Sequence, residues 1–172
     1  VKIGDTCRVA PKLIRLAGSR VAGRPIDDRI GCLMLFEAAK TAKAYENDVY
    51  FVFTVQEEVG VRGAKTSAFS VAPDYAVAVD IGGAGDVPNC APFEVVLGGG
   101  IAVKLKDGMV ICHKKMIEAM KSVADEENVP IQYEVLESGG TDTCMLQQAA
   151  GGCVAGALSI PTRYGHLSLI HI

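Results

Sequence analysis

Two adjacent carboxylates, Glu57 and Glu58, directly follow an apolar run at positions 49–55 that is rich in β-branched and aromatic residues. A turn signal, Gly60, comes two residues later. This composition predicts a buried strand whose tip carries the two acids. Neighbouring acids beyond a strand can point in different directions, so one can bind a metal ion while the other moves a proton. The alternative is a solvated strand end, but the preceding strand and the glycine favour a metal-dependent active site.

Further polar groups follow two other apolar runs. Asp80 closes a run at positions 75–81, and His166 comes soon after a run at positions 154–160. In open α/β sheets, ligands bind at the carboxyl ends of strands, so we expect these groups to gather with the Glu57–Glu58 pair at one sheet edge. Carboxylates together with histidine suit zinc, cobalt or manganese and need no thiolate. Each residue alone could be a turn or surface residue, and only their convergence indicates a site.

Three other polar residues have simpler interpretations. Asp28 is expected to cap a helix that starts near Arg29 or to pair with that arginine, rather than to bind a metal. Asp86 is expected to hydrogen-bond within its loop, and His113 to be exposed at the start of an amphipathic helix. None of the three is therefore assigned a catalytic role.

Two glycine-containing segments are candidates for substrate contact. Gly98–Gly100 lacks the Lys-Ser/Thr of a P-loop and the G-x-G-x-x-G pattern, which excludes nucleotide binding. Gly99 and Gly100 are instead expected to let the backbone approach a bound substrate closely. The segment Gly139-Gly-Thr-Asp142 either caps a helix or lines the substrate cleft, and two of its residues, Gly140 and Thr141, are assigned to substrate binding.

The elements that must position these groups alternate between strand and helix. This alternation predicts an α/β fold whose sheet is covered by helices on both faces. Short strands are expected within residues 1–22, including an unpartnered strand at 12–16. The remaining strands are predicted at 49–55, 75–81, 95–105, 131–136 and 154–160. Helices are predicted at 29–46, 62–69, 109–127 and 139–150.

Composition limits the possible partners and compartments. The chain has 172 residues, 49% of them hydrophobic, and a net charge of -3, which gives no reason to expect nucleic acid or a membrane surface as a partner. No apolar run is long enough to span a bilayer, and no secretory signal pattern opens the sequence. The six cysteines form no C-x-x-C pair. They are therefore expected to be reduced thiols of a cytoplasmic protein.

The motifs occur in an order that resembles one family of enzymes. They are Asp27-Asp-Arg-Ile-Gly31, Gln56-Glu-Glu-Val-Gly60 with Arg62-Gly-Ala64, Ala78-Val-Asp80 with Ala84-Gly-Asp86, Gly139-Gly-Thr-Asp142 and Ile160-Pro-Thr-Arg-Tyr-Gly-His166. The sequence resembles the dinuclear metal aminopeptidases known as glutamyl or deblocking aminopeptidases. These include the tetrahedral self-compartmentalising enzymes, and some relatives carry the label cellulase M. The resemblance covers the chain from about Val1 to His166.

The resemblance implies roles for individual residues. Asp27 would bridge two divalent metal ions, most commonly Zn²⁺ or Co²⁺. Glu58 and His166 would complete one metal site, and Asp80 would belong to the other. Glu57 would be the general base in the hydrolysis of N-terminal residues from peptides. The full protein would be a homo-oligomer.

The resemblance also implies a mixed sheet of the zinc-peptidase type and a division of the chain. Residues 1–22 would be the tail of an inserted β-rich dimerisation domain, and residues 23–166 the C-terminal part of the catalytic domain. Residues 167–172 match one reading frame of a common sequencing-library adapter, so a non-native tail is expected there. The chain would then be a fragment cut at both ends.

One departure from the family pattern bears on activity. The family takes a further histidine ligand from well upstream of the Asp27 motif, whereas the histidines here are at positions 113, 166 and 171 only. The isolated chain is therefore expected to be inactive. A non-catalytic binding or assembly protein on the same fold is the main alternative. A glycosidase is disfavoured because its two acids must flank the scissile bond from opposite sides, which adjacent residues do not readily do.

Overall fold

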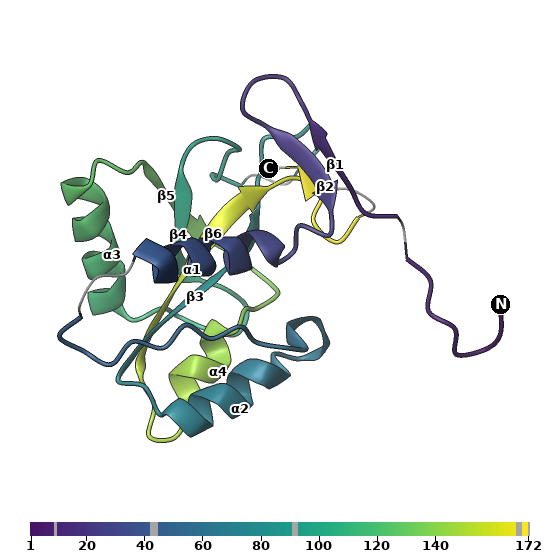
Figure 1. The fold of residues 1–172 in the computed structure, drawn as a ribbon. Coiled ribbons are helices and arrows are strands. Elements are labelled where there is room, and N and C mark those ends of the chain that lie inside the picture. Colours follow the sequence, from purple (N-terminus) through teal and green to yellow (C-terminus); the bar gives the residue numbers. More distant parts are fainter. Residues whose placement is uncertain (9, 42–44, 91–92, 168–169, 172) are drawn as a thin grey trace.

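A four-stranded mixed sheet lies at the centre of the computed structural model, which describes residues 1–8, 10–41, 45–90, 93–167 and 170–171 (Figure 1). The strand order is β3-β6-β4-β5. β3 pairs with β6 and β4 pairs with β5 in parallel, whereas β4 and β6 are antiparallel. The strands are β3 (Tyr75–Gly83), β4 (Ile101–Lys106), β5 (Ile131–Val135) and β6 (Val154–Thr162). The mixed α/β class predicted from the sequence is confirmed.

Helices cover both faces of this sheet. They are α1 (Arg29–Thr41), α2 (Arg62–Val71), α3 (Lys114–Glu126) and α4 (Thr143–Gln148). A Cβ atom added to Gly156 in β6 would lie 2.5 Å from Met116 of α3. The next residue, Ala157, packs in a cluster with Cys144 of α4. Because successive strand residues point to opposite faces, α3 and α4 lie on opposite sides of the sheet.

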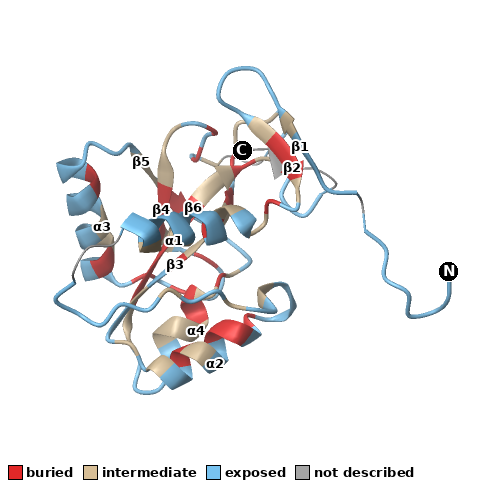
Figure 2. Ribbon diagram, in the orientation of Figure 1, coloured by how far each residue is buried: buried red, intermediate tan, exposed pale blue. Residues whose placement is uncertain are grey.

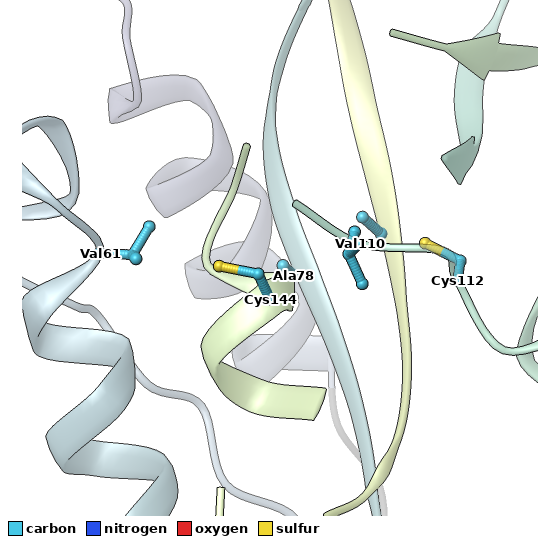
Figure 3. Close-up of a cluster of buried hydrophobic side chains, with 6 residues drawn as sticks. Val61, Ala78, Val110, Cys112 and Cys144 are labelled. Atoms are coloured by element: carbon cyan, nitrogen blue, oxygen red, sulfur yellow. The ribbon is translucent and has the colours of Figure 1, made fainter. Parts of the chain in front are cut away.

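The cluster around Ala157 forms the hydrophobic core (Figure 3). Its buried members are small side chains, namely Val61, Ala78, Val110, Cys112, Cys144 and Ala157. All six cysteines of the chain lie in its described part, and all six are free. Within the described residues, no helix is both long and apolar enough to cross a bilayer.

A second, three-stranded sheet contains the N-terminal strands β1 (Lys12–Arg15) and β2 (Val21–Arg24) and the short strand β7 (Ile170–His171). Its order is β1-β2-β7, and both pairings are antiparallel. The prediction that the strand near residue 12 has no partner is wrong, because a hairpin pairs it with β2. The predicted tail at 167–172 lies partly outside the described residues, at positions 168, 169 and 172.

The strand predicted at residues 49–55 does not form in the described structure, where this segment pairs with no neighbour. Its side chains are largely exposed, including Tyr50, Phe53 and Val55 (Figure 2). β-branched and aromatic residues favour a pleated surface, but a strand also needs a partner for its backbone hydrogen bonds. Composition alone therefore predicted a strand at 49–55 for which the described residues provide no partner strand.

Several boundaries also differ from the predictions. α1 ends at Thr41 and residues 45–48 are not helical, so the helix predicted to extend to residue 46 is shorter; residues 42–44 lie outside the described structure. β4 starts only at Ile101, because the preceding Gly98–Gly100 segment forms a turn. α3 and α4 are shorter than predicted at both ends, whereas α2 and β3 are longer.

Candidate metal centre

Asp27 and Asp28 lie between the end of β2 and the start of α1. The backbone N–H of Gly31 donates to Asp28 Oδ1 at 3.0 Å, which confirms the predicted helix cap. A Cβ atom on residue 31 would lie 2.2 Å from the Asp28 carboxylate, so a larger residue there would have to displace the capping side chain. One oxygen of Asp28 is thus used to begin the helix, whereas Asp27 lies just outside that helix.

Glu57 and Glu58 lie on a single 3-10 turn, η1 (Glu57–Val59), rather than at a strand tip. The turn is entered through Gln56 and left through Gly60, both with left-handed backbone angles, φ 59° and φ 114°. The N–H of Gly63 at the start of α2 donates to the carbonyl of Val55 at 2.9 Å. The local backbone thereby bends sharply and presents two successive carboxylates just before α2.

His166 reaches these acids from the segment that follows β6. Its Nε2 atom lies 3.2 Å from Asp27 Oδ2 and 3.3 Å from Glu58 Oε2. One ligand atom from each of the three residues lies within 4.8 Å of the others. The His166 side chain is 74% exposed, so the group opens toward solvent. Two carboxylates and an imidazole at this spacing fit a divalent metal ion such as Zn²⁺ or Co²⁺.

Asp80 is in β3, opposite Ser159 of β6, and the strand continues for three residues beyond it. Its Oδ1 atom accepts a hydrogen bond of 2.7 Å from the backbone N–H of Ile81. Burial raises the pKa of Asp80 to about 8, with a further contribution from the negative charge of Asp28. The charges of Glu57 and Asp27 also act to raise this pKa.

The cluster concentrates more negative charge than the described side chains neutralise. Burial raises the pKa of Asp28 to about 7; the hydrogen bond from the Gly31 N–H acts to lower this pKa, and the charge of Asp27 acts to raise it. Burial is also the largest cause of the raised pKa values of Asp27 and Glu57. The next cause is the charge of Glu58 for Asp27, and the charge of Asp142 for Glu57. Mutual repulsion among partly buried carboxylates is what bound cations relieve, and clusters of this kind mark functional sites.

The glycines assigned to substrate have packing roles in the structure. A Cβ atom on Gly100 would lie 2.1 Å from the carbonyl oxygen of Pro130, and one on Gly99 would meet the Gln132 amide at 2.7 Å. These glycines precede β4, which is antiparallel to β6, so they lie toward the sheet edge where β6 ends. Their role in substrate binding stays a prediction.

The second pair assigned to substrate, Gly140 and Thr141, lies just before α4. A Cβ atom on Gly140 would lie 2.4 Å from the sulfur of Met109. Thr141 is buried, and its hydroxyl is 2.9 Å from that of Thr143. Packing explains both residues, and their assignment to substrate binding also stays a prediction.

Asp86 and Arg163 form a paired contact near His166. Arg163 donates from Nε to Asp86 Oδ1 at 2.8 Å and from Nη2 to Oδ2 at 2.6 Å. The N–H of Leu97 also donates to Oδ2, at 3.1 Å, which confirms that Asp86 hydrogen-bonds within its loop. The pair joins this loop to the segment that carries His166. Sequence reasoning missed Arg163, although it lies within the motif that ends at His166.

Two other polar contacts were not anticipated. Lys104 and Glu134 form an ion pair between β4 and β5, and both side chains are fully buried. The hydroxyl of Ser159 donates to Glu134 at 2.7 Å. A charged residue inside each apolar strand was the available signal. The other contact joins Thr54 to Asp142 at 2.6 Å, and no pattern linked these distant positions.

The order of these groups along the chain matches a known family. The sequence profile of the M42 glutamyl aminopeptidases covers residues 1–172. The chain belongs to the M42 glutamyl aminopeptidase family. M42 enzymes are metal-dependent aminopeptidases, in agreement with the resemblance inferred from the motifs.

Three relatives illustrate the match. A protein from Acetivibrio thermocellus, provisionally named an aminopeptidase, is 47% identical over 167 residues, which are 96% of this chain and 50% of the relative. The structure of aminopeptidase APDkam598 from Desulfurococcus kamchatkensis gives a TM-score of 0.90 at 37% identity, over 95% of this chain and 47% of that one. The TET1 peptidase of Pyrococcus horikoshii gives 0.81 at 32% identity, over 95% and 48%.

The M42 chain therefore spans about half the length of the relatives it matches. These neighbours have the zinc-peptidase type of α/β fold, so the predicted fold class is confirmed at this level also.

Proposed function

We propose that the protein containing this chain is an aminopeptidase that removes N-terminal residues from peptides at a two-metal site, with Glu57 as general base. The observation that carries the proposal is the convergence of Asp27, Glu58 and His166 within 4.8 Å of one another, directly beside Glu57. Membership of a family of metal-dependent aminopeptidases supports the same reaction class.

In this proposal, Glu58 and His166 would hold one divalent ion, Asp80 would hold a second, and Asp27 would contact both. Zn²⁺ and Co²⁺ suit this set of carboxylate and imidazole donors. When bound, the ions would supply Lewis-acid polarisation of the scissile carbonyl and an affinity for the free α-amine of the peptide.

Glu57 would move the proton. It is next to the ligand Glu58 on the same turn, yet it is not one of the three residues whose ligand atoms converge. Burial and the neighbouring charges of Asp142 and Glu58 raise its pKa, which makes its carboxylate a stronger base. It would accept a proton from the attacking water and return it to the leaving amine.

The remainder of the catalytic domain would complete the site. Residues on α1 and in segment 49–55 present exposed apolar side chains, including Leu33, Phe36 and Phe53. Together they would offer an apolar surface of the kind that marks an interface. We propose that the part of the relatives' length that this chain does not match packs here and supplies the further histidine ligand. The isolated chain would then be inactive.

Assembly and location follow from separate observations. The Pyrococcus horikoshii relative can assemble into a tetrahedron or a large octahedral shell. We propose that the full protein is also a homo-oligomer, with residues 1–22 as the tail of its dimerisation domain. Residues 167–172 would be a non-native tail of this chain and absent from the full protein. Free thiols are typical of reducing compartments, so a cytoplasmic location is proposed.

The test uses the complete gene product. Peptides with a free N-terminus should be cleaved, and the same peptides with an acetylated N-terminus should not. Chelation should abolish cleavage, and Zn²⁺ or Co²⁺ should restore it. Hydrolysis of glycosides that resists chelation would support a glycosidase instead, and metal binding without any peptidase activity would support a non-catalytic protein.

A further inference from the structure

A hydrogen bond joins the turn that carries Glu57 to a distant element. The hydroxyl of Thr54 donates to Asp142 Oδ2 at 2.6 Å across 88 positions of sequence. Thr54 lies three residues before Glu57, in the segment 49–55 that has no strand partner in the described structure. Asp142 directly precedes α4, which packs on β3 and β6. The bond therefore connects an otherwise unpaired segment to the central sheet through one short helix.

The other backbone bonds of this segment are local. Gly63 N–H donates to the Val55 carbonyl, and Arg62 N–H donates to the Gln56 carbonyl, at 2.9 and 3.2 Å. Both donors come from the first residues of α2, so these bonds determine the shape of the turn. Within the described residues, the Thr54 hydroxyl makes the one hydrogen bond that ties residues 49–56 to chain beyond residue 63. It therefore constrains where the turn lies relative to the sheet.

Asp142 is not simply a helix cap. It occupies the N-cap position of α4, but its side chain makes no capping hydrogen bond. Its second oxygen, Oδ1, is buried and has no hydrogen-bond partner among the described residues. After burial, its charge is also the largest cause of the raised pKa of Glu57. The carboxylate therefore binds Thr54 with one oxygen and lies close to the proposed base.

We propose that Thr54 and Asp142 are positioning residues whose hydrogen bond holds Glu57 at its working place beside the metal ligands. This proposal rests on the proposed function, because a position matters only if Glu57 reacts. Misplacement of a catalytic group by about 1 Å can reduce the rate roughly 100-fold. A hydroxyl is required at position 54, and a hydrogen-bond acceptor is required at position 142.

The kinetic test compares Thr54→Val with Thr54→Ser in the complete, metal-loaded protein. Thr54→Val should lower kcat roughly 10- to 100-fold with KM and metal content unchanged, and Thr54→Ser should stay near the parent value. Thr66→Val is the matched control, because Thr66 is exposed and its hydroxyl bonds only within α2. An unchanged kcat in Thr54→Val, or an equal loss in Thr54→Ser, overturns the proposal.

Position 142 separates geometry from charge. Asp142→Asn keeps an oxygen acceptor for the Thr54 hydroxyl, whereas Asp142→Ala removes it. The proposal expects a much smaller loss of kcat in Asp142→Asn than in Asp142→Ala. Equal losses would mean that the charge, and not the hydrogen bond, is what matters, and would overturn the positioning role.

Hydrogen exchange tests the link without relying on peptidase activity. The amides of Arg62 and Gly63 bond to the Glu57 turn, so their exchange reports how well that turn is held. Exchange should be faster in Thr54→Val than in Thr54→Ser, at equal global stability. Equal exchange in both overturns the link. If the parent protein cleaves no peptide, the proposed function fails, yet exchange still decides whether the link holds the turn.

Discussion

Asp80 and the Glu57–Glu58 pair contribute to one acidic cluster but are held in different ways. Asp80 lies inside β3, which is paired with β6 along its whole length from Tyr75 to Gly83. The glutamates lie on one 3-10 turn that follows an unpaired segment. A ladder of backbone hydrogen bonds positions the first, whereas two local backbone bonds, a close glycine contact and one side-chain bond position the second.

This difference determines which changes should disturb the site. Many backbone hydrogen bonds between β3 and β6 fix the position of Asp80 together. A change in a single nearby side chain should therefore have a small effect on that position. Few contacts fix the position of the turn, so the loss of any one of them should have a larger effect. Changes at the turn and at His166 should therefore reduce activity or metal binding strongly. A change at Asp80 should act mainly by removing its charge.

The largest effect is expected from the base itself. Glu57→Gln keeps the size and shape of the side chain but cannot accept a proton, so kcat should fall about 10²- to 10⁴-fold. Metal content should stay at the parent level, because Glu57 is not one of the three converging ligands. Glu118→Gln, at an exposed position on α3, is the control and should leave kcat unchanged. Full activity in Glu57→Gln would exclude it as the base.

Removing an imidazole should weaken metal binding. His166→Ala deletes one of three converging ligands, so affinity should fall by more than the roughly 10- to 100-fold that follows loss of a residue that only supports a ligand. Metal titration by calorimetry measures this. His113→Ala is the control, because His113 caps α3 and is exposed. Unchanged affinity in His166→Ala would remove it from the ligand set.

The turn should tolerate no side chain at position 63. A Cβ atom there would lie 2.4 Å from the Val55 carbonyl oxygen and 2.5 Å from its nitrogen, so Gly63→Ala must displace the segment before Glu57. Overpacking of this kind costs about 1–3 kcal/mol, measurable as a shift in the urea midpoint, and kcat should fall with it. Gly83→Ala meets nothing within 4 Å and is the matched control. Equal effects of the two substitutions would contradict this account.

The smallest effect is expected from Asp80, which should make stability depend on pH. Burial raises the pKa of Asp80 to about 8, far above its unfolded value of 3.8. The folded, metal-free chain therefore binds more protons than the unfolded chain between these values, so the free energy of unfolding should fall as pH rises from 5 to 8. The change should be at least about 1 kcal/mol. Asp80→Asn should make this dependence less steep without removing it, because the pKa of Asp28 is also raised, to about 7. Saturating Zn²⁺ should also make it less steep; a rise in stability over this range would contradict the assignment.

The chemistry of the site could be predicted from sequence because it depends on residue type and order. Asp27, Glu58, Asp80 and His166 each follow or adjoin a recognisable element, and the motif order pointed to the family that the profile confirms. The structure brings Asp27, Glu58 and His166 together, and the charges that act on Asp80 come from the same cluster. Their individual roles as ligands remain predictions.

The path of the chain around the site could not be predicted in the same way. The run at 49–55 has strand composition, but strand formation depends on a partner that composition does not specify. The Thr54–Asp142 bond and the Asp86–Arg163 pair join positions that are 88 and 77 residues apart. Pairs this far apart in sequence produce no periodic pattern of residue types, because contacts of this kind depend on how the elements pack.

The sequence by itself determined the alternation of helices and strands, the identity of the acids and histidine, and the family. Local propensity, hydrophobic spacing and residue chemistry act over a few neighbouring positions, so they can be recognised from the sequence alone. Tertiary structure alone decided that Glu57 lies on a turn, that Asp80 is half-buried within a strand, and that Thr54 reaches Asp142. Burial and distant contacts arise only when segments pack, so they depend on the whole fold.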